Sequence, residues 1–125
     1  MQGYECKVIN ASKELSARER IKVKDLSNAI ALDTAVTDDT PLMISPLYDV
    51  ELEVHNEKSK DKDYKKYVIV DVAGNKYHTG SESFWTAYKD IMAELGDDTE
   101  DVTLEVYRVP SKNYAGKSFI TCSLA

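Results

Sequence analysis

Hydrophobic and polar residues alternate along several segments of the chain. The alternation is strict over residues 49–55, so Val50, Leu52 and Val54 are predicted to face a core. Residues 67–72 form a nearly continuous β-branched run, and the Gly74-Asn75 pair that follows predicts a two-residue hairpin turn. That turn leads into a short strand at 76–78. Two further strands are predicted, at 102–107 and at 118–124.

A helical repeat separates the third of these strands from the fourth. Its apolar positions share one stripe: Phe84, Trp85, Tyr88, Ile91, Met92 and Leu95. Either Thr79 with Glu82, as a capping box, or Ser81 alone fits the start, and Gly96 fits the end. Because Phe84 and Trp85 belong to the stripe, we expect them to be core residues and not a ligand platform.

The N-terminal third has weaker patterns. Residues 21–24 and 29–32 predict short strands joined by a turn near 26–28, residues 12–20 a short helix or an arm, and residues 37–46 a connecting loop. From residue 47 the order is strand, strand, strand, helix, strand, strand. We therefore expect a mainly β (α+β) fold with an OB-like five-stranded Greek-key barrel, its helix between strands three and four.

The length of 125 residues fits a single domain, 1–125, with an N-terminal arm or hairpin and loop at 1–46 and the OB-like core at 47–125. No apolar stretch approaches the ~20 residues that span a bilayer, and the N-terminus lacks the pattern of a secretory signal. A cytoplasmic location is the expectation, with Cys6 and Cys122 as free thiols.

Catalytic and metal-binding motifs are missing from the sequence. There is no glycine-rich phosphate loop, no His and Cys cluster at metal spacing and no nucleophile motif. The predicted hairpin register places His78 opposite Asp71, which we interpret as a cross-strand polar contact. The acidic run at 97–101 lacks the spacing of a calcium loop. We expect no enzymatic activity and no cofactor.

Positive charge is concentrated in two segments of an acidic protein. The net charge is −6, yet residues 56–66 hold five lysines against three acids, and residues 108–117 hold three cations and no acid. The rest of the chain therefore carries −11. In the barrel interpretation these segments join strands one to two and four to five, the loops with which OB folds bind oligonucleotides.

Aromatic residues accompany the cations in both segments. Lysines that follow phosphates, with rings on which bases stack, suit single-stranded nucleic acid bound without sequence preference. The candidate phosphate contacts are Lys58, Lys60, Lys62, Lys65, Lys66, Arg108, Lys112 and Lys117. The candidate stacking residues are Tyr64, Tyr67, Tyr107, Tyr114 and Phe119.

Several short stretches also resemble a family of small single-stranded DNA-binding proteins from phages of Gram-positive bacteria. They are residues 54–59, 63–69, 74–77, 79–85, 110–114, 116–117 and 119–124. The resemblance runs from about Arg18 to the C-terminus and implies DNA binding in phage replication or recombination. Many bacterial single-strand binding proteins end in an acidic tail, whereas this chain ends in an apolar strand, so tail-mediated recruitment is not implied.

Two functions follow as hypotheses. The first is single-stranded DNA binding in a bacterial host cell, with RNA not distinguished from DNA, no membrane contact and a homodimer as a further expectation. The alternative is a small acidic phage protein that inhibits a host protein as a DNA mimic or anti-defence protein. Its basis is a run of carboxylates without an intervening cation: Glu94, Asp97, Asp98, Glu100, Asp101 and Glu105.

Overall fold

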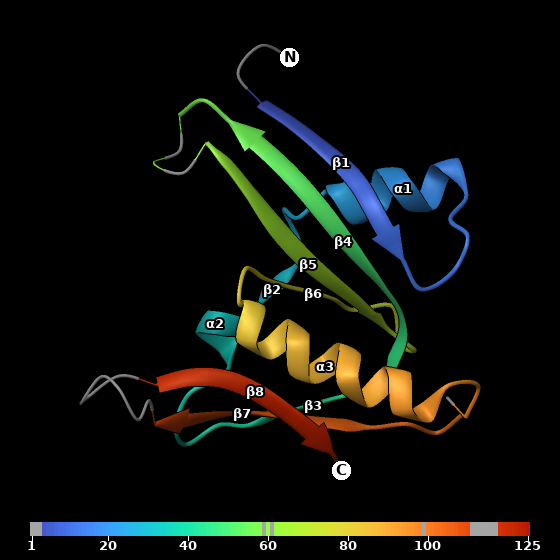
Figure 1. Cartoon of the computed structure of the whole chain (residues 1–125), viewed down its shortest axis with the longest axis vertical. Helices are drawn as coiled ribbons and strands as arrows, with labels where there is room; N and C mark the ends of the chain where they lie inside the picture. Colours follow the sequence, from blue (N-terminus) through green and yellow to red (C-terminus); the bar gives the residue numbers. More distant parts are fainter. Residues whose placement is uncertain (1–3, 59, 61, 99, 111–117) are drawn as a thin grey trace. The chain divides into compact units, whose positions relative to one another are not determined.

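A computed structural model describes residues 4–58, 60, 62–98, 100–110 and 118–125 (Figure 1). Within these residues the chain is mainly β, as predicted. The strands are β1 (Tyr4–Ala11), β2 (Ile30–Ala31), β3 (Leu42–Ile44), β4 (Pro46–Asn56), β5 (Asp63–Asp71), β6 (Lys76–Thr79), β7 (Leu104–Pro110) and β8 (Ser118–Leu124). The helices are α1 (Ala17–Lys24), α2 (Leu32–Ala35) and α3 (Glu82–Leu95).

The strands form two open sheets. One has five strands in the order β1-β4-β5-β6-β2, and the other has three in the order β3-β7-β8. Neither sheet is closed among the described residues, so the OB-like barrel is not confirmed. The strand and helix order predicted from residue 47 onward is correct, but N-terminal strands that lie outside the predicted barrel take edge positions in both sheets.

The chain divides into two compact units that interleave in sequence. Unit 1 comprises residues 1–30 and 47–80, and unit 2 comprises residues 31–46 and 81–125. Residues 1–46 are therefore shared between the units and do not form a separate arm. That the chain folds as a single domain stays a prediction.

Unit 1 builds its core from the strictly alternating strand. Val50 and Leu52 are fully buried in β4 and Val54 nearly so, as their alternation predicted. Val50 and Leu52 share a cluster with Val68 of β5 and Val23 of α1. Burial of each such side chain is worth roughly 1.5–3 kcal/mol, so this face of the sheet and α1 hold each other in place.

The start of unit 1 differs from its prediction. Residues 21–24, predicted as a strand, form the last turn of α1, because Ser16 forms a capping box with Glu19. The Glu19 amide donates to the Ser16 hydroxyl at 3.1 Å, and the Glu19 carboxylate accepts from the Ser16 amide at 2.9 Å. The strand predicted at residues 29–32 is present in shorter form, as β2. Strand β1, which was not predicted, pairs antiparallel with β4.

The hairpin between β5 and β6 has a longer turn than predicted. Val70 pairs with Lys76, and the Asp71 amide donates to the Asn75 carbonyl at 2.9 Å, so three residues separate the paired positions. His78 therefore lies opposite Val68, and the predicted His78–Asp71 pair is wrong. Asp71 instead accepts from the Asn75 amide at 2.8 Å, which fixes the turn. Gly74 has a φ of +92°, a conformation that favours glycine.

Unit 2 packs α3 on β8 (Figure 1). Ser81 is the N-cap, its hydroxyl accepting from the Phe84 amide at 3.2 Å, and Gly96 ends the helix with a φ of +58°. Phe84, Trp85 and Tyr88 are buried, so the prediction that Phe84 and Trp85 are core residues is confirmed, while Ile91, Met92 and Leu95 are half-buried.

The three-stranded sheet of unit 2 has two different faces. Leu104 and Val106 of β7 and Ile120 and Cys122 of β8 are buried, as the alternation predicted, whereas Leu124 is 56% exposed. Residues 37–46, predicted as a loop, include the third strand, β3. Because α3 packs on β8 and the buried residues share one face, α3 covers that face and the alternate face carries the other side chains.

Candidate nucleic-acid interface

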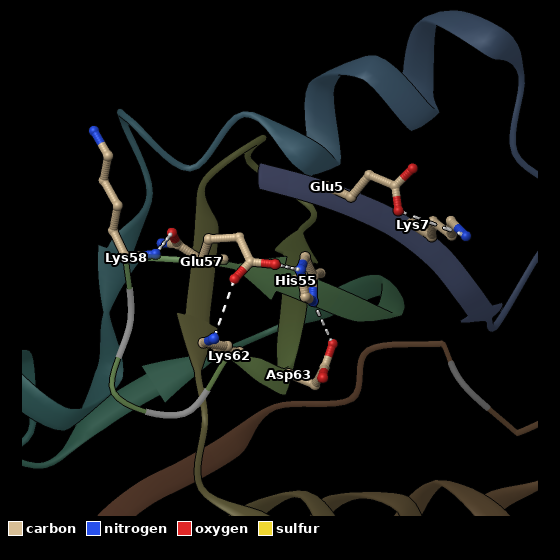
Figure 2. Close-up of polar contacts among 8 residues, drawn as sticks. Glu5, Lys7, His55, Glu57, Lys58, Lys62 and Asp63 are labelled. Atoms are coloured by element: carbon tan, nitrogen blue, oxygen red, sulfur yellow. Dashed lines mark hydrogen bonds and ion pairs between the residues drawn. The ribbon is translucent and has the colours of Figure 1, made fainter. Parts of the chain in front are cut away.

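The lysine-rich segment of unit 1 is the connection between β4 and β5. The Asn56 amide donates to the Lys62 carbonyl at 2.7 Å, and the Asn56 side chain accepts from the Lys58 amide at 3.0 Å. These bonds close the hairpin and hold Lys58 at its rim, where its side chain extends away from the network beside it (Figure 2). Lys58 and Lys60 are both exposed.

His55 lies at the base of this connection between two carboxylates (Figure 2). Its Nδ1 is 2.7 Å from Asp63 and its Nε2 is 2.8 Å from Glu57. Lys62 also approaches Glu57, at 3.3 Å. An imidazole can donate to both carboxylates only when it carries two protons, so the geometry favours the charged ring.

The same contacts shift the pKa values of His55 and Glu57. The hydrogen bond to Asp63, followed by that to Glu57, raises the pKa of His55. The hydrogen bond from His55, followed by that from Lys62, lowers the pKa of Glu57. Nothing in the sequence singles out His55, because its partner Asp63 is eight residues away and the β4–β5 register is needed to bring them together.

The remaining unit 1 candidates differ in how accessible they are. Lys65 is exposed but lies 3.6 Å from Glu51, and Lys66 and Tyr64 are half-buried. Tyr67 is only 4% exposed and belongs to the buried part of β5. A ring so covered offers no face on which a base could stack, so Tyr67 does not belong to an interface in this structure.

Two aromatic candidates of unit 2, Tyr107 and Phe119, lie on one face of the three-stranded sheet. Tyr107 of β7 pairs with Thr121 of β8, and Val109 pairs with Phe119. Tyr107 and Phe119 are therefore diagonal neighbours on the face opposite α3, where such positions are roughly 7–8 Å apart. Phe119 is 40% exposed and Tyr107 is half-buried.

The neighbours of these two rings on the same face include an apolar side chain, Met43, and an acidic one, Glu105. Met43 of β3 lies on the same face and is 53% exposed, and it pairs with Glu105 of β7. The Tyr107 hydroxyl accepts a hydrogen bond from Ser123 at 3.1 Å, which fixes the ring. We call Met43, Tyr107 and Phe119 the open face of the sheet.

Arg108 is on the other side of β7 and is used within unit 2. Its Nε donates to the Val36 carbonyl at 2.6 Å, and its other nitrogens donate to the Asp33 carbonyl and the Ser118 hydroxyl. The guanidinium thus anchors the end of α2 to β7. These contacts use three of the five N–H donors of the guanidinium, one on each nitrogen, which argues for a structural role.

Three candidates lie outside the described residues. Lys112, Tyr114 and Lys117 belong to the segment that connects β7 and β8 in the sequence. Their assignment to nucleic-acid binding stays a prediction.

Charge is distributed unequally between the units. Unit 1 contains twelve of the sixteen Lys and Arg residues and eleven acids, a net charge of +1. Unit 2 contains four cations and eleven acids, a net charge of −7. The aromatic open face therefore belongs to the acidic unit, and most of the candidate phosphate contacts belong to the other.

A polar hollow of about 280 Å³ lies on the sheet of unit 1, beside His55. It is lined by Glu5 and Lys7 of β1, Glu53 and His55 of β4, and Asp63 of β5. Sequence reasoning missed the β1 side because it predicted no strand there. The alternation of Cys6 and Val8 with Glu5, Lys7 and Ile9 was the available signal.

The described part of the chain was searched for metal-binding clusters and for helices that could cross a membrane. No group of three or more His, Cys, Asp or Glu side chains there could hold a metal ion. No helix among the described residues has the length and apolar character needed to cross a membrane.

The chain was compared with known proteins at the levels of family, sequence and fold. It matches no protein-family model, no curated protein and no solved structure.

Proposed function

We propose that this protein binds single-stranded DNA without sequence preference. Bases would stack on Tyr107 and Phe119 of the open face, and lysines would contact phosphates. The observation that carries the proposal is that these two rings lie side by side on an uncovered face of the three-stranded sheet. Each base stacked on an aromatic ring contributes roughly 1–3 kcal/mol, whatever its identity.

Phosphate contacts come from the exposed lysines of the lysine-rich segment. Lys58 and Lys60 are exposed and form no ion pair with a described residue, so they can approach phosphates without giving up a partner. Lys62, Lys65 and Lys66 are weaker candidates because the first two are paired with Glu57 and Glu51 and the third is half-buried. Lys112 and Lys117 remain in the proposal on the sequence alone, with Tyr64 and Tyr114 as further stacking residues.

The proposal does not depend on an OB-like barrel. An open sheet with rings on one face offers the same stacking platform as a barrel strand. The resemblance to phage single-stranded DNA-binding proteins gives an independent reason for this function and for a role in replication or recombination.

The open face is tested by titrating a labelled oligo-dT and measuring its anisotropy with ring variants. Phe119→Ala is expected to weaken binding by about 1–3 kcal/mol, the contribution of one stacked base. Tyr107→Ala should act in the same direction, whereas Tyr107→Phe keeps the ring and should bind like the wild type. Leu124→Ala removes a comparably exposed apolar side chain from the opposite face of β8 and serves as the matched control. Unchanged binding by Phe119→Ala would remove the open face from the interface.

The phosphate contacts are tested through salt dependence. The affinity of the wild type is expected to fall steeply as salt rises, because bound counterions are no longer released favourably. Lys58→Ala and Lys60→Ala should each make the slope shallower by roughly 0.7 for every phosphate that the variant no longer neutralises. Phe119→Ala should leave the slope nearly unchanged. The absence of any binding at low salt would refute the proposed function itself.

One observation favours the alternative, an acidic protein that binds and inhibits a host protein. Unit 2 has a net charge of −7, and Glu94, Asp97, Asp98 and Asp101 are all exposed. A surface rich in carboxylates can imitate the charge of DNA. Capture from a host lysate, repeated after nuclease treatment, separates the two functions. A protein partner retained after nuclease supports the inhibitor, and loss of all partners supports nucleic-acid binding.

A further inference from the structure

The two sheets have four edges, and three of them are protected against pairing with another strand. Strand β1 carries Glu5 and Lys7 and has a register shift between Val8 and Asn10. Strand β2 has two residues, and β3 has three, with Pro41 before it and Pro46 shortly after. Charges, bulges, prolines and short length all discourage edge pairing.

The fourth edge, β8, has none of these protections. Its seven residues, Ser118 to Leu124, include no charge and no proline, and its register with β7 runs without a shift. Among the described residues β8 is paired on one side only, with β7. A strand of this kind exposes a row of backbone donors and acceptors along its free side.

The backbone groups on that free side can be identified. The Ala125 amide donates to the Thr103 carbonyl at 2.9 Å, so this pair is hydrogen-bonded. Bonded and non-bonded pairs alternate in an antiparallel ladder. The pair of Pro110 with Ser118 then falls among the non-bonded pairs, as it must, because proline has no N–H.

It follows that alternate residues of β8 direct their amides and carbonyls away from β7. They are Ser118, Ile120, Cys122 and Leu124. The residues between them, Phe119, Thr121 and Ser123, use theirs to bond β7.

We propose that β8 pairs antiparallel with β8 of a second copy of this chain, about a two-fold axis at Thr121. Thr121 is the central residue of the strand, so this register engages all four outward residues. Ile120 pairs with Cys122 of the other copy, and Ser118 pairs with Leu124 of the other copy. Each such pair can exchange two backbone hydrogen bonds.

The side chains fit a second copy in this register. Residues related by the axis have the same parity, so each pair lies on one face of the combined sheet. On the α3 side, Ile120 and Cys122 are already buried within each copy and contribute their backbone groups, whereas Leu124, now 56% exposed, becomes partly covered. On the open face, Phe119 meets Ser123, and the two Thr121 side chains form a favourable cross-strand pair.

The negative charge of unit 2 also favours contact between two copies along β8. Unit 2 carries −7, so two copies repel each other over most approaches. Strand β8 is charge-free along its whole length, and edge pairing places it at the centre of the contact. The product is a six-stranded sheet in which the open faces of both copies lie on one side.

The association is tested without nucleic acid, by measuring molar mass in analytical ultracentrifugation. The wild type is expected to have twice the chain mass of 14.1 kDa at high protein concentration and to dissociate on dilution. Thr121→Lys places two like charges opposite each other at the axis and should give a monomer. Met43→Lys adds the same charge to the same face on the opposite edge strand and should leave the dimer intact.

A mixing experiment guards against misfolded variants. Thr121→Glu should also be monomeric alone, but an equimolar mixture of Thr121→Lys and Thr121→Glu should dimerise, because opposite charges then meet at the axis. Dimerisation of the mixture alone supports pairing at Thr121. A wild type that is monomeric at all concentrations, or a Thr121→Lys variant that still dimerises, would overturn it.

Cross-linking tests the register itself. In a Cys6→Ser background, Thr121→Cys should form a disulfide between copies under mild oxidation. The two Cα atoms of a non-bonded pair are about 4.5 Å apart, within disulfide range. Phe119→Cys should not cross-link, since its two copies lie roughly 13 Å apart along the paired strands. Burial raises the pKa of Cys122 to about 11, so this thiol should contribute little background. Cross-linking at 119 and not at 121 would refute the register.

The salt dependence of dimerisation distinguishes β8 pairing from the proposed DNA binding. Dimerisation should strengthen as salt screens the repulsion between acidic units, whereas DNA binding should weaken. A dimer that does not bind oligo-dT would refute only the function, and a monomer that binds it would refute only the pairing.

Discussion

Arg108 holds the end of α2 by donating to the carbonyls of Val36 and Asp33. Arg108→Gln should leave at least one half-buried carbonyl without a donor, and we expect it to lower the free energy of unfolding by about 1–3 kcal/mol. Urea unfolding followed by Trp85 fluorescence measures this, because Trp85 belongs to the same unit.

Arg18→Gln is the matched control for this change. The Arg18 side chain is exposed and makes no polar contact with a described residue, so its replacement should alter stability by less than about 0.5 kcal/mol. If Arg108→Gln were as stable as the control but bound oligo-dT with a shallower salt slope, Arg108 would be a phosphate contact and not an anchor.

His55 should make the stability of unit 1 depend on pH. Its pKa is raised in the folded protein by Asp63 and Glu57, above the roughly 6.5 of an unfolded chain. A raised folded pKa contributes stability that is fully present below the unfolded value and is lost as pH rises through the folded value. The wild type should therefore exceed His55→Gln in stability most clearly near pH 5.5, with the difference shrinking toward pH 8.

The relative contributions of Asp63 and Glu57 to the raised pKa of His55 can be checked by NMR titration of the His55 ring. Asp63→Asn should lower its pKa more than Glu57→Gln does, because the bond to Asp63 is the larger cause of the shift. A His78→Gln variant assigns the resonances, since the chain has only two histidines. A His55 pKa at or below 6.5 in the wild type would contradict the bridged geometry.

At the scale of elements, we expect α1 to depend strongly on its capping box, because Val23 is its only buried residue. Ser16→Ala removes the acceptor for the Glu19 amide and should lower the stability of α1 by about 1 kcal/mol. Hydrogen exchange of the α1 amides measures the change, and Ser16→Asn, which can still cap, should restore most of the protection. Equal exchange in Ser16→Ala and the wild type would show that packing of Val23 alone maintains the helix.

The weak apolar face of α1 explains why the pattern at residues 21–24 predicts the wrong element. Ile21 and Val23 alternate with lysines as in a strand, but only Val23 is buried, and Ile21 is 69% exposed. A two-residue period and a helical face that buries one position cannot be distinguished over four residues. The longer periods, at 49–55 and 84–95, predict the correct elements because several residues agree on one face.

The candidate interface was predictable only where local pattern decides which way a residue faces. Tyr107 and Phe119 share a face because both strands alternate, and that much follows from sequence. The burial of Tyr67 and the contacts of Arg108 arise from segments distant in the chain, residues 31–36 in the case of Arg108. His55 and Asp63 likewise meet through strand register, which composition does not contain.

At the scale of the whole molecule, the two units are joined without linkers. The first crossing falls within β2, between Ile30 and Ala31, and the second between Pro46 and Leu47 at the start of β4. The third falls between Gly80 and Ser81, directly before α3. Unfolding of one unit would thus free the ends of elements that belong to the other.

We therefore expect the chain to unfold as a single cooperative domain. Leu52→Ala should lower the stability of unit 1 by about 2–5 kcal/mol, because Leu52 is fully buried. Trp85, the only tryptophan, reports on unit 2. In a cooperative domain the Trp85 transition in urea should shift to lower denaturant and coincide with the transition in far-UV circular dichroism. Leu47→Ala, in the same strand but 61% exposed, should leave both transitions in place. If Leu52→Ala instead split the two signals and left the Trp85 midpoint unchanged, the units would be independent and the single-domain prediction would be wrong.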